Sequence, residues 1–181
     1  MASSKQEAQW VLRAQCNDRE SLECLLRSVQ PLLRRYLVRL TSESNADDVL
    51  QDVLLTLCRK IFWLRNPNLF RPWAYRIASR AAFRHLKNER VRSEQVMDDF
   101  DAIEQLETEP VEDSRGILEM LLTLESIPPA SRAVLLLHFQ EELSLPEVAG
   151  ILAIPLGTAK SRLASGLAML RKHLGKDRSF K

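Results

Sequence analysis

The sequence predicts an all-α protein made of two small helical domains that are joined by an acidic, flexible linker. The chain has 181 residues and only five glycines, and apolar residues recur along most of it at the spacing of α-helices. Its formal net charge of +2 averages over strongly segregated stretches: Glu89 is the sole acid in residues 59–92, and residues 93–114 contain no base. This pattern predicts a domain over residues 1–92, a linker over 93–115 and a second domain over 116–181. Two basic bodies favour a polyanionic partner that is touched in two places.

Four helices are expected in the first domain from the spacing of its apolar residues. They cover residues 5–15, 18–40, 44–61 and 72–90. Pro31 is expected to kink or break the second helix, because proline cannot donate to the helical ladder. Ser44 is the expected N-cap of the third helix, with Asp47 three residues on in the capping-box position.

The segment between the third and fourth helices combines aromatic and basic side chains. Asn66, Pro67 and Asn68 mark it as a loop, and Pro72 suits the first turn of the next helix. Aromatic rings in such a loop can stack on exposed bases while arginines hold the phosphates. The residues that could do so are Phe62, Trp63, Arg65, Phe70, Arg71 and Trp73. Alternatively these rings are core anchors, which we expect for at least one or two of the aromatic residues.

The fourth helix has one apolar face and one basic face. The basic row consists of Arg76, Arg80, Arg84 and Lys87, and it is roughly 16 Å long at 1.5 Å per residue. A solvated helix would usually place acids four residues away from such a row, and none is present. The row therefore favours a face that follows phosphates over an ordinary solvated surface.

The second domain is expected to be a four-helix domain that contains a helix-turn-helix. Its helices are predicted over residues 116–127, from Pro128-Pro129 to about 140, after Ser144, and from about Gly157 onward. Ser144 caps the third of these helices, with Glu147 completing a capping box. The last helix places Leu163, Leu167, Leu170 and Leu174 on one side and Thr158, Ser161, Arg162, Ser165 and Lys172 on the other. This arrangement suits a helix that reads the major groove, and an ordinary amphipathic helix is the alternative.

Other classes of function find little support in the sequence. The three cysteines, Cys16, Cys24 and Cys58, are too scattered for a disulfide framework, and no metal-ligand spacing of cysteine or histidine exists. Neither a metal nor another cofactor is expected. No glycine-rich phosphate loop or nucleophile–base pair indicates an enzyme. No membrane insertion is expected, because no apolar run reaches the roughly 18 residues of a membrane span, and we expect a cytoplasmic protein.

The order of these motifs resembles a known family. The segments ADDVLQDV, FRPWAYRIASR, IPPASRAVLLLHF and LSLPEVAGILAIPLGTAKSRL are similar to those of the extracytoplasmic-function (ECF) sigma factors of bacterial RNA polymerase, over nearly the whole chain. The resemblance implies promoter recognition and strand opening on behalf of core RNA polymerase, with promoter DNA bound both as duplex and as melted strand. It also implies regulation by an anti-sigma factor.

The resemblance assigns a role to each group of residues. Polymerase docking falls on Asp48, Gln51 and Asp52. Capture of the minus-10 element falls on the loop from Phe62 to Arg71, with Arg65 and Asn66, and on the helix that follows, with Trp73, Arg76, Arg80, Arg84 and Lys87. Recognition of the minus-35 element falls on Thr158, Lys160, Ser161, Arg162 and Ser165. The acidic linker is expected to occupy basic channels of the polymerase.

The chain departs from the family pattern in several places. Pro155-Leu156 replaces the usual Ser-Glu before the last helix, which removes the usual N-cap. Ala153 and Glu142 stand where turn glycines are common, so strain or altered turns are expected there. Two alternative functions remain: a sigma-like regulator that acts through protein contacts, favoured by Leu156, and a helix-turn-helix repressor that acts without polymerase.

Overall fold

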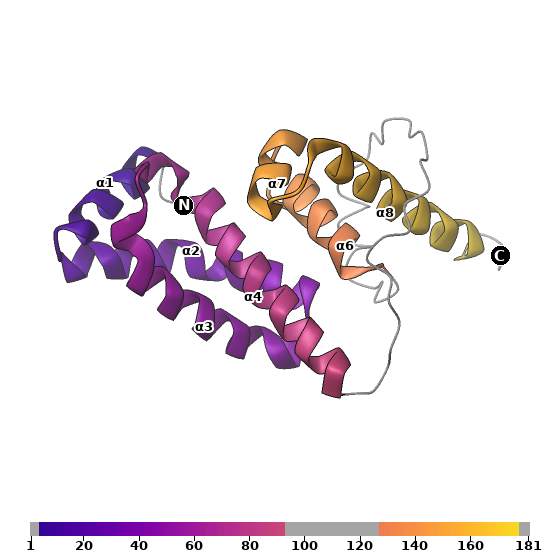
Figure 1. The fold of residues 1–181 in the computed structure, drawn as a ribbon, viewed down its shortest axis with the longest axis horizontal. Coiled ribbons are helices and arrows are strands. Elements are labelled where there is room, and N and C mark those ends of the chain that lie inside the picture. Colours follow the sequence, from indigo (N-terminus) through magenta and orange to yellow (C-terminus); the bar gives the residue numbers. More distant parts are fainter. Residues whose placement is uncertain (1–3, 93–126, 178–181) are drawn as a thin grey trace. The chain divides into compact units, whose positions relative to one another are not determined.

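The computed structural model describes residues 4–92 and 127–177, with the side chains of 92 and 173–177 left out. The chain divides into two compact units, Met1–Glu94 and Gln95–Lys181, and each is described by itself. Within the described residues every regular element is a helix (Figure 1), which confirms the all-α prediction. The predicted acidic linker and nearly all of the helix predicted over residues 116–127 lie outside the described residues.

The first unit is a bundle of four helices around one apolar core. Its helices are α1 (Ser4–Gln15), α2 (Arg19–Leu40), α3 (Glu43–Lys60) and α4 (Phe70–Arg92). Helix α2 packs against each of the other three. At the centre, the ring of Tyr36 meets that of Tyr75 edge-on at 5.5 Å. The Tyr36 hydroxyl lies 2.8 Å from the Ser79 hydroxyl, so the polar tip of this buried ring is satisfied inside the core.

Two local expectations for this unit need correction: Pro31 does not break α2, and Ser44 is not an N-cap. Helix α2 runs unbroken through Pro31. Proline inside a helix costs about 3 kcal/mol, but α2 buries apolar side chains on both sides of Pro31, from Leu25 to Leu40, and that burial outweighs the cost. Helix α3 begins at Glu43 with Ser42, not Ser44, at the N-cap. Asp47 makes no capping box, because its carboxylate binds Arg34 of α2 instead.

The connection between α3 and α4 is more ordered than a plain loop. It contains two short 3₁₀ turns, η1 (Ile61–Trp63) and η2 (Pro67–Leu69). The Asn66 side chain accepts a hydrogen bond of 3.1 Å from the backbone N–H of Asn68 and so caps η2. Helix α4 starts at Phe70, two residues before the predicted Pro72. Pro72 therefore still lies in the first turn, where its missing N–H leaves no helical bond unmade.

The described part of the second unit contains α6 (Pro129–Leu135), a π-helical turn η3 (Leu136–Gln140), α7 (Leu145–Leu152) and α8 (Leu156–Asp177). The predicted capping box is confirmed: Glu147 accepts hydrogen bonds from the Ser144 backbone N–H at 2.9 Å and from its hydroxyl at 2.5 Å. Helices α6 and α8 pack closely. A Cβ at Gly166 of α8 would lie 2.6 Å from a methyl carbon of Leu135, so this glycine permits the close packing.

The turns of the second unit are strained, as the missing glycines predict. Glu142 and Ala153 both have φ of 55°, in the left-handed region that disfavours side chains with a Cβ. Ala153 ends α7, and the next backbone N–H, from Ile154, bonds to the Ala149 carbonyl at 3.1 Å. The turn between α7 and α8 thus keeps a left-handed geometry without glycine.

Candidate nucleic-acid and protein interfaces

Helix α3 presents an acidic face to solvent. Asp48, Gln51 and Asp52 are all exposed, and no ion pair joins either aspartate to another described residue. The neighbouring Asp47 differs, because its hydrogen bonds to Arg34, at 2.8 and 3.3 Å, lower the pKa of its carboxyl group. The two aspartates predicted to dock a partner are therefore available, whereas the adjacent one is already neutralised.

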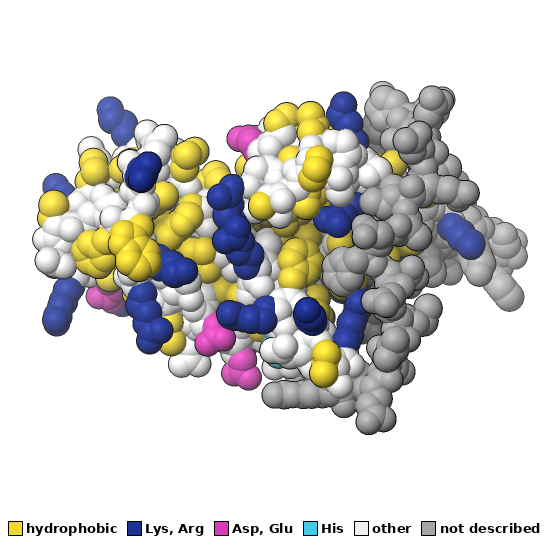
Figure 2. Space-filling model, in the orientation of Figure 1, with side chains coloured by type: hydrophobic (Ala, Val, Ile, Leu, Met, Phe, Trp, Pro, Cys, Tyr) yellow, Lys and Arg dark blue, Asp and Glu magenta, His cyan; other side chains and the backbone are white. Residues whose placement is uncertain are grey.

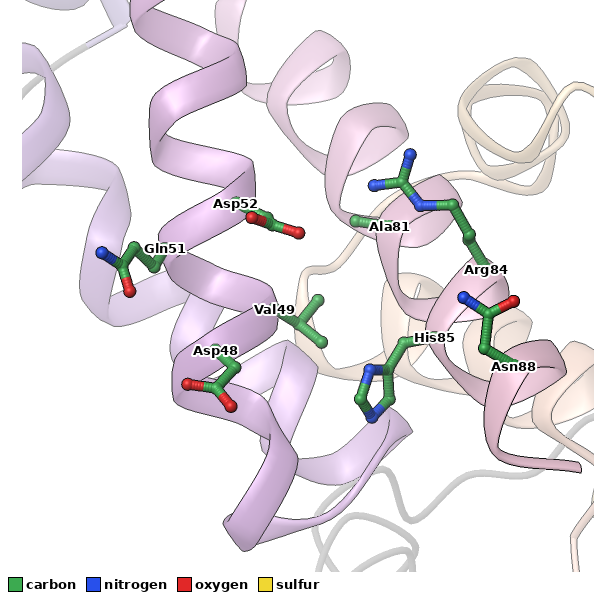
Figure 3. A pocket seen from close by; sticks show the side chains of 8 residues that line it. All are labelled: Asp48, Val49, Gln51, Asp52, Ala81, Arg84, His85 and Asn88. Atoms are coloured by element: carbon green, nitrogen blue, oxygen red, sulfur yellow. The ribbon is translucent and has the colours of Figure 1, made fainter. Parts of the chain in front are cut away.

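A hollow of about 310 Å³ separates this acidic face from α4. Figure 3 shows Asp48, Gln51 and Asp52 coming from α3 and Arg84, His85 and Asn88 from α4. Its floor includes Val49 and Ala81, which are buried. The sequence did not indicate that α4 contributes to this surface, because the two sets of residues are about thirty positions apart in the chain.

Two of the four predicted aromatic side chains in residues 62–73, Phe62 and Trp63, are exposed. Phe62 is half exposed and Trp63 is 73 % exposed, although large apolar side chains are usually buried in a folded domain. Phe70 is 1 % exposed and Trp73, which is partly buried, packs beside it with ring centroids 6.2 Å apart. Phe70 is therefore a core anchor and not a ring on which a base could stack, because its faces are covered by protein. Arg65 and Asn66 are exposed.

Arg71, a predicted phosphate ligand, is engaged inside the protein. Its Nε lies 2.8 and 3.0 Å from the two carboxylate oxygens of Glu7, and its Nη2 lies 2.7 Å from one of them. The Glu7 side chain is only 4 % exposed. The pair fastens the start of α4 to α1, and with its charge balanced there Arg71 is a structural residue.

Helix α1 also holds the loop at a second point. The Gln15 side-chain amide donates hydrogen bonds of 2.9 Å each to the backbone carbonyls of Ile61 and Leu64. These two carbonyls lie on either side of the exposed Phe62-Trp63 pair. Neither Glu7 nor Gln15 was found from the sequence, because each acts over a separation of 46 to 64 residues.

The basic row of α4 lies on the surface of the first unit. Arg80, Arg84 and Lys87 are exposed, Arg76 is partly buried, and within the described chain the three exposed cations form no ion pair. A second hollow, of about 280 Å³, brings Arg80 and Arg84 together with residues of α3; it is lined by Thr56, Arg59, Lys60, Ile77, Arg80, Ala81 and Arg84. In Figure 2 lysine and arginine side chains clearly outnumber acids on the visible face. The sequence missed the contribution of Arg59 and Lys60.

Helix α8 divides into a buried and an accessible side. Leu167 and Leu170 are buried with Ala159 and Ala164, and Leu163 is partly buried, so the predicted apolar stripe packs inward; the side chain of Leu174 lies outside the description. Lys160 is exposed, whereas Thr158, Ser161, Arg162 and Ser165 are partly exposed. The Ser161 hydroxyl donates to the Thr158 carbonyl at 3.1 Å. At the tip of the helix Leu156 is 40 % exposed.

Metal clusters and membrane-spanning helices can be assessed in the described residues. No group of three or more histidines, cysteines or acids in them could hold a metal ion, and no helix in the part that the structure describes is long and apolar enough to cross a membrane. What they do define is an all-helical protein of two units, with a helix-turn-helix in the second.

Comparison with known families is consistent with an all-helical protein that contains a helix-turn-helix, and it identifies the family. The family model for sigma-70 region 2 matches residues 25–92, and the model for sigma-70 region 4 matches residues 117–170. The chain belongs to the sigma-70 family of RNA polymerase sigma factors, in its ECF group. The first match lies within the first unit, from within α2 to the end of α4, and the second lies within the second unit.

Several curated relatives are similar over most of this chain. The ECF RNA polymerase sigma factor SigE of Mycolicibacterium smegmatis is 29 % identical over 142 residues, which make up 76 % of this chain but only 55 % of that protein. The RNA polymerase sigma factor SigV of Bacillus subtilis is 28 % identical over 155 residues, 85 % of this chain and 90 % of the relative. The ECF RNA polymerase sigma-E factor of Escherichia coli is 27 % identical over 169 residues, 84 % and 86 % of the two chains.

Two solved structures share the fold. One, the structure of CnrH in complex with the cytosolic domain of CnrY, matches with a TM-score of 0.65 at 18 % identity, covering 95 % of this chain and 99 % of that one. The other is the sigma factor RpoE in complex with the anti-sigma factor NepR from Bartonella quintana, with a TM-score of 0.65 at 20 % identity, covering 84 % and 96 %. At these identities the likeness concerns the fold alone.

Proposed function

We propose that this protein binds core RNA polymerase in the bacterial cytoplasm and directs it to promoters by recognising minus-10 and minus-35 elements and by assisting strand opening. The observation that carries the proposal is the exposed Phe62-Trp63 pair, held on an ordered turn shortly before α4, whose exposed cations Arg80, Arg84 and Lys87 form no ion pair within the described residues. An apolar ring that is 73 % exposed lowers the solubility of a protein, and stacking on an unpaired base buries it.

Polymerase docking is assigned to Asp48, Gln51 and Asp52. Two unpaired carboxylates separated by one helical turn suit a partner that presents lysine or arginine side chains. The hollow beside them makes this face concave, so a partner side chain can enter between α3 and α4.

Strand opening is assigned to the loop and to α4. Extruding a base costs a few kcal/mol, and stacking on an aromatic side chain returns about 1–3 kcal/mol per base. Phe62 and Trp63 are assigned to stacking, with Arg65 and Asn66 beside them. The phosphates are assigned to Arg76, Arg80, Arg84 and Lys87, and each cation that meets a phosphate adds to a salt-dependent attraction. Phe70, Arg71 and Trp73 are left out because they are wholly or partly taken up by contacts within the protein.

Reading of the minus-35 element is assigned to α8. Thr158, Lys160, Ser161, Arg162 and Ser165 are all at least partly accessible on this helix, and hydroxyl, ammonium and guanidinium groups can reach base edges and phosphates in the major groove. We also propose that an anti-sigma factor holds the protein inactive, since one of the structures that share its fold is a sigma factor in complex with the anti-sigma factor NepR.

A first experiment tests the function as a whole. The purified protein is mixed with its host's core RNA polymerase, and transcripts from a pool of host genomic fragments are mapped. Binding with discrete new start sites is the expected result, and it also supplies the promoter sequence. Failure of a folded sample to bind core polymerase would refute the proposal.

A charge-reversal variant tests the docking face. Replacing Asp48 and Asp52 together by lysine is expected to abolish binding to core polymerase, because like charges then face each other across the interface. The matched control replaces Glu20 and Glu23, two exposed acids of α2, by lysine and is expected to bind normally. Equal affinity of the two double variants would remove the docking assignment.

One alternative is favoured by a specific observation. Leu156 is exposed at the tip of α8, where an apolar side chain suits a protein contact better than a phosphate. A regulator that keeps polymerase binding but acts through protein contacts would bind core polymerase without initiating transcription. The same mapping experiment distinguishes this case.

A further inference from the structure

We infer that Gln15 is a positioning residue for base capture: its side-chain amide fixes the turn that presents Phe62 and Trp63. The inference rests on the proposed function, to which it adds a residue of α1, a helix that otherwise has no part in it. Gln15 touches neither DNA nor polymerase in this scheme and acts only through the aromatic pair.

The geometry points to positioning because of where the two hydrogen bonds fall. Gln15 Nε2 donates at 2.9 Å to the Ile61 carbonyl, one residue before the pair, and at 2.9 Å to the Leu64 carbonyl, one residue after it. Both hydrogens of the amide are thus used on one short turn. The turn has a bond of its own, from the Leu64 N–H to the Ile61 carbonyl at 3.1 Å, so the amide joins the two ends of an existing loop.

The burial of the residues around the pair supports the same conclusion. Ile61 and Leu64 are buried whereas Phe62 and Trp63 between them are exposed. The exposed rings therefore have little packing of their own, and the turn is held by the buried side chains of Ile61 and Leu64 together with its backbone hydrogen bonds. The Glu7–Arg71 pair anchors the far end of the connection to the same helix α1.

Preorganisation is the reason why such a clamp matters for function. A loop that is already in the binding conformation does not lose conformational entropy when a base stacks on it. If the turn is released, the rings remain chemically intact but are no longer held in place. Capture of a base then weakens, while contacts made by α3 and α8 do not change.

The test uses Gln15→Glu, with Gln9→Glu as its matched control. Glutamate has nearly the size of glutamine but cannot donate, and its charge would face two carbonyl oxygens. Gln9 is an exposed glutamine of the same helix, so its replacement adds the same charge at a neutral site. Gln15→Met is the second variant, in case the carboxylate prevents folding, because it removes the donor without adding a charge.

The measured quantity is the affinity of the holoenzyme for the single-stranded non-template minus-10 segment of a promoter mapped as above. We expect Gln15→Glu or Gln15→Met to weaken it about fivefold to tenfold, the size of one or two lost hydrogen bonds, and Gln9→Glu to change it less than about twofold. Affinity for core polymerase is expected to stay unchanged. Hydrogen exchange of the free protein should accelerate in residues 61–69 and not in the helices α2 and α3.

A double-mutant cycle separates positioning from a general structural role. In a Phe62→Ala, Trp63→Ala background the Gln15 variants are expected to have no further effect on oligonucleotide affinity, because the groups through which Gln15 acts are gone. The inference is overturned if the Gln15 variants lose as much oligonucleotide affinity in the Phe62→Ala, Trp63→Ala background as in the parent. It is also overturned if, in the parent, Gln15→Glu binds the strand as tightly as Gln9→Glu. A parent holoenzyme that does not hold the oligonucleotide at all overturns the proposed function instead.

Discussion

Removing either partner of the Glu7–Arg71 ion pair is expected to have unequal effects on stability. The carboxylate is 4 % exposed and the guanidinium side chain is 35 % exposed, so only the arginine can turn to water when its partner is lost. Arg71→Met should therefore destabilise the first unit more than Glu7→Gln. Equal costs would be expected if the pair lay at the surface.

The contacts allow the two costs to be worked out. After Arg71→Met the Glu7 carboxylate keeps, among the described residues, only the Ser28 hydroxyl at 3.5 Å. Stranding a buried charge costs about 3–5 kcal/mol, and the partial exposure of Arg71 places this case at the lower end, about 3 kcal/mol. After Glu7→Gln the amide oxygen can still accept one hydrogen bond and no charge is stranded, so the loss is about 1 kcal/mol. With Gln already at position 7, Arg71→Met should cost much less than it does alone.

Urea unfolding followed by tryptophan fluorescence measures these losses in the full chain. All three tryptophans, Trp10, Trp63 and Trp73, lie in the first unit, so the signal reports on that unit alone. Arg27→Met is the control, because its pair with Glu23 is exposed and should contribute less than about 1 kcal/mol. If Glu7→Gln costs as much as Arg71→Met, burial of the carboxylate does not control the energy of the pair and the reasoning fails.

Three further predictions concern the second unit. Arg162→Ala should weaken transcription from a duplex promoter without changing affinity for core polymerase; equal transcription would count against a reading role for α8. Ser144→Ala should cost about 1 kcal/mol at neutral pH, measured by thermal unfolding monitored by circular dichroism. Hydrogen bonds from the Ser144 side chain and backbone lower the pKa of the Glu147 carboxyl below its ordinary value of 4.5. Its share of this stability is therefore fully present above that ordinary value and is lost as the pH falls through the lowered pKa. A stability difference between the parent and Ser144→Ala that grows in acid would contradict this expectation. Ala153→Gly should raise the melting temperature, because it relieves about 1 kcal/mol of strain at φ 55°; a lower melting temperature would show that the alanine side chain is worth more than the strain.

Local signals in the sequence predicted most of the helices but not the contacts that join them. The capping box at Ser144 was predictable because both of its residues lie within one turn. The N-cap at Ser42 was not predictable, because Asp47 binds Arg34 of α2 and no local pattern reveals this tertiary contact. That Pro31 does not break α2 was not predicted for a related reason: the cost of proline is local, whereas the burial that outweighs it comes from three neighbouring helices.

The candidate site shows the same division between features that local sequence predicts and features that depend on tertiary contacts. Charge and exposure on α3 and α4 follow from helical spacing, so Asp48, Asp52 and the cations of α4 could be proposed from the sequence. The sequence could not predict which residues of the aromatic–basic loop face outward, because FWLRNPNLFRPW carries rings and arginines throughout. The structure separates them: Phe70 enters the core and Arg71 binds Glu7, whereas Phe62 and Trp63 stay exposed.

The left-handed residues of the second unit explain how the chain can depart from the family pattern and keep its fold. At Glu142 and Ala153 the backbone holds a conformation that suits glycine, and each substitution costs about 1–2 kcal/mol. The helices that these turns connect bury Leu136, Leu137 and Val148 almost completely, and each such side chain contributes about 1.5–3 kcal/mol. Packing therefore fixes the turns, and α8 follows α7 through the left-handed turn at Ala153 despite the missing glycine. The departures should lower the stability of the unit before they change which face of α8 is accessible.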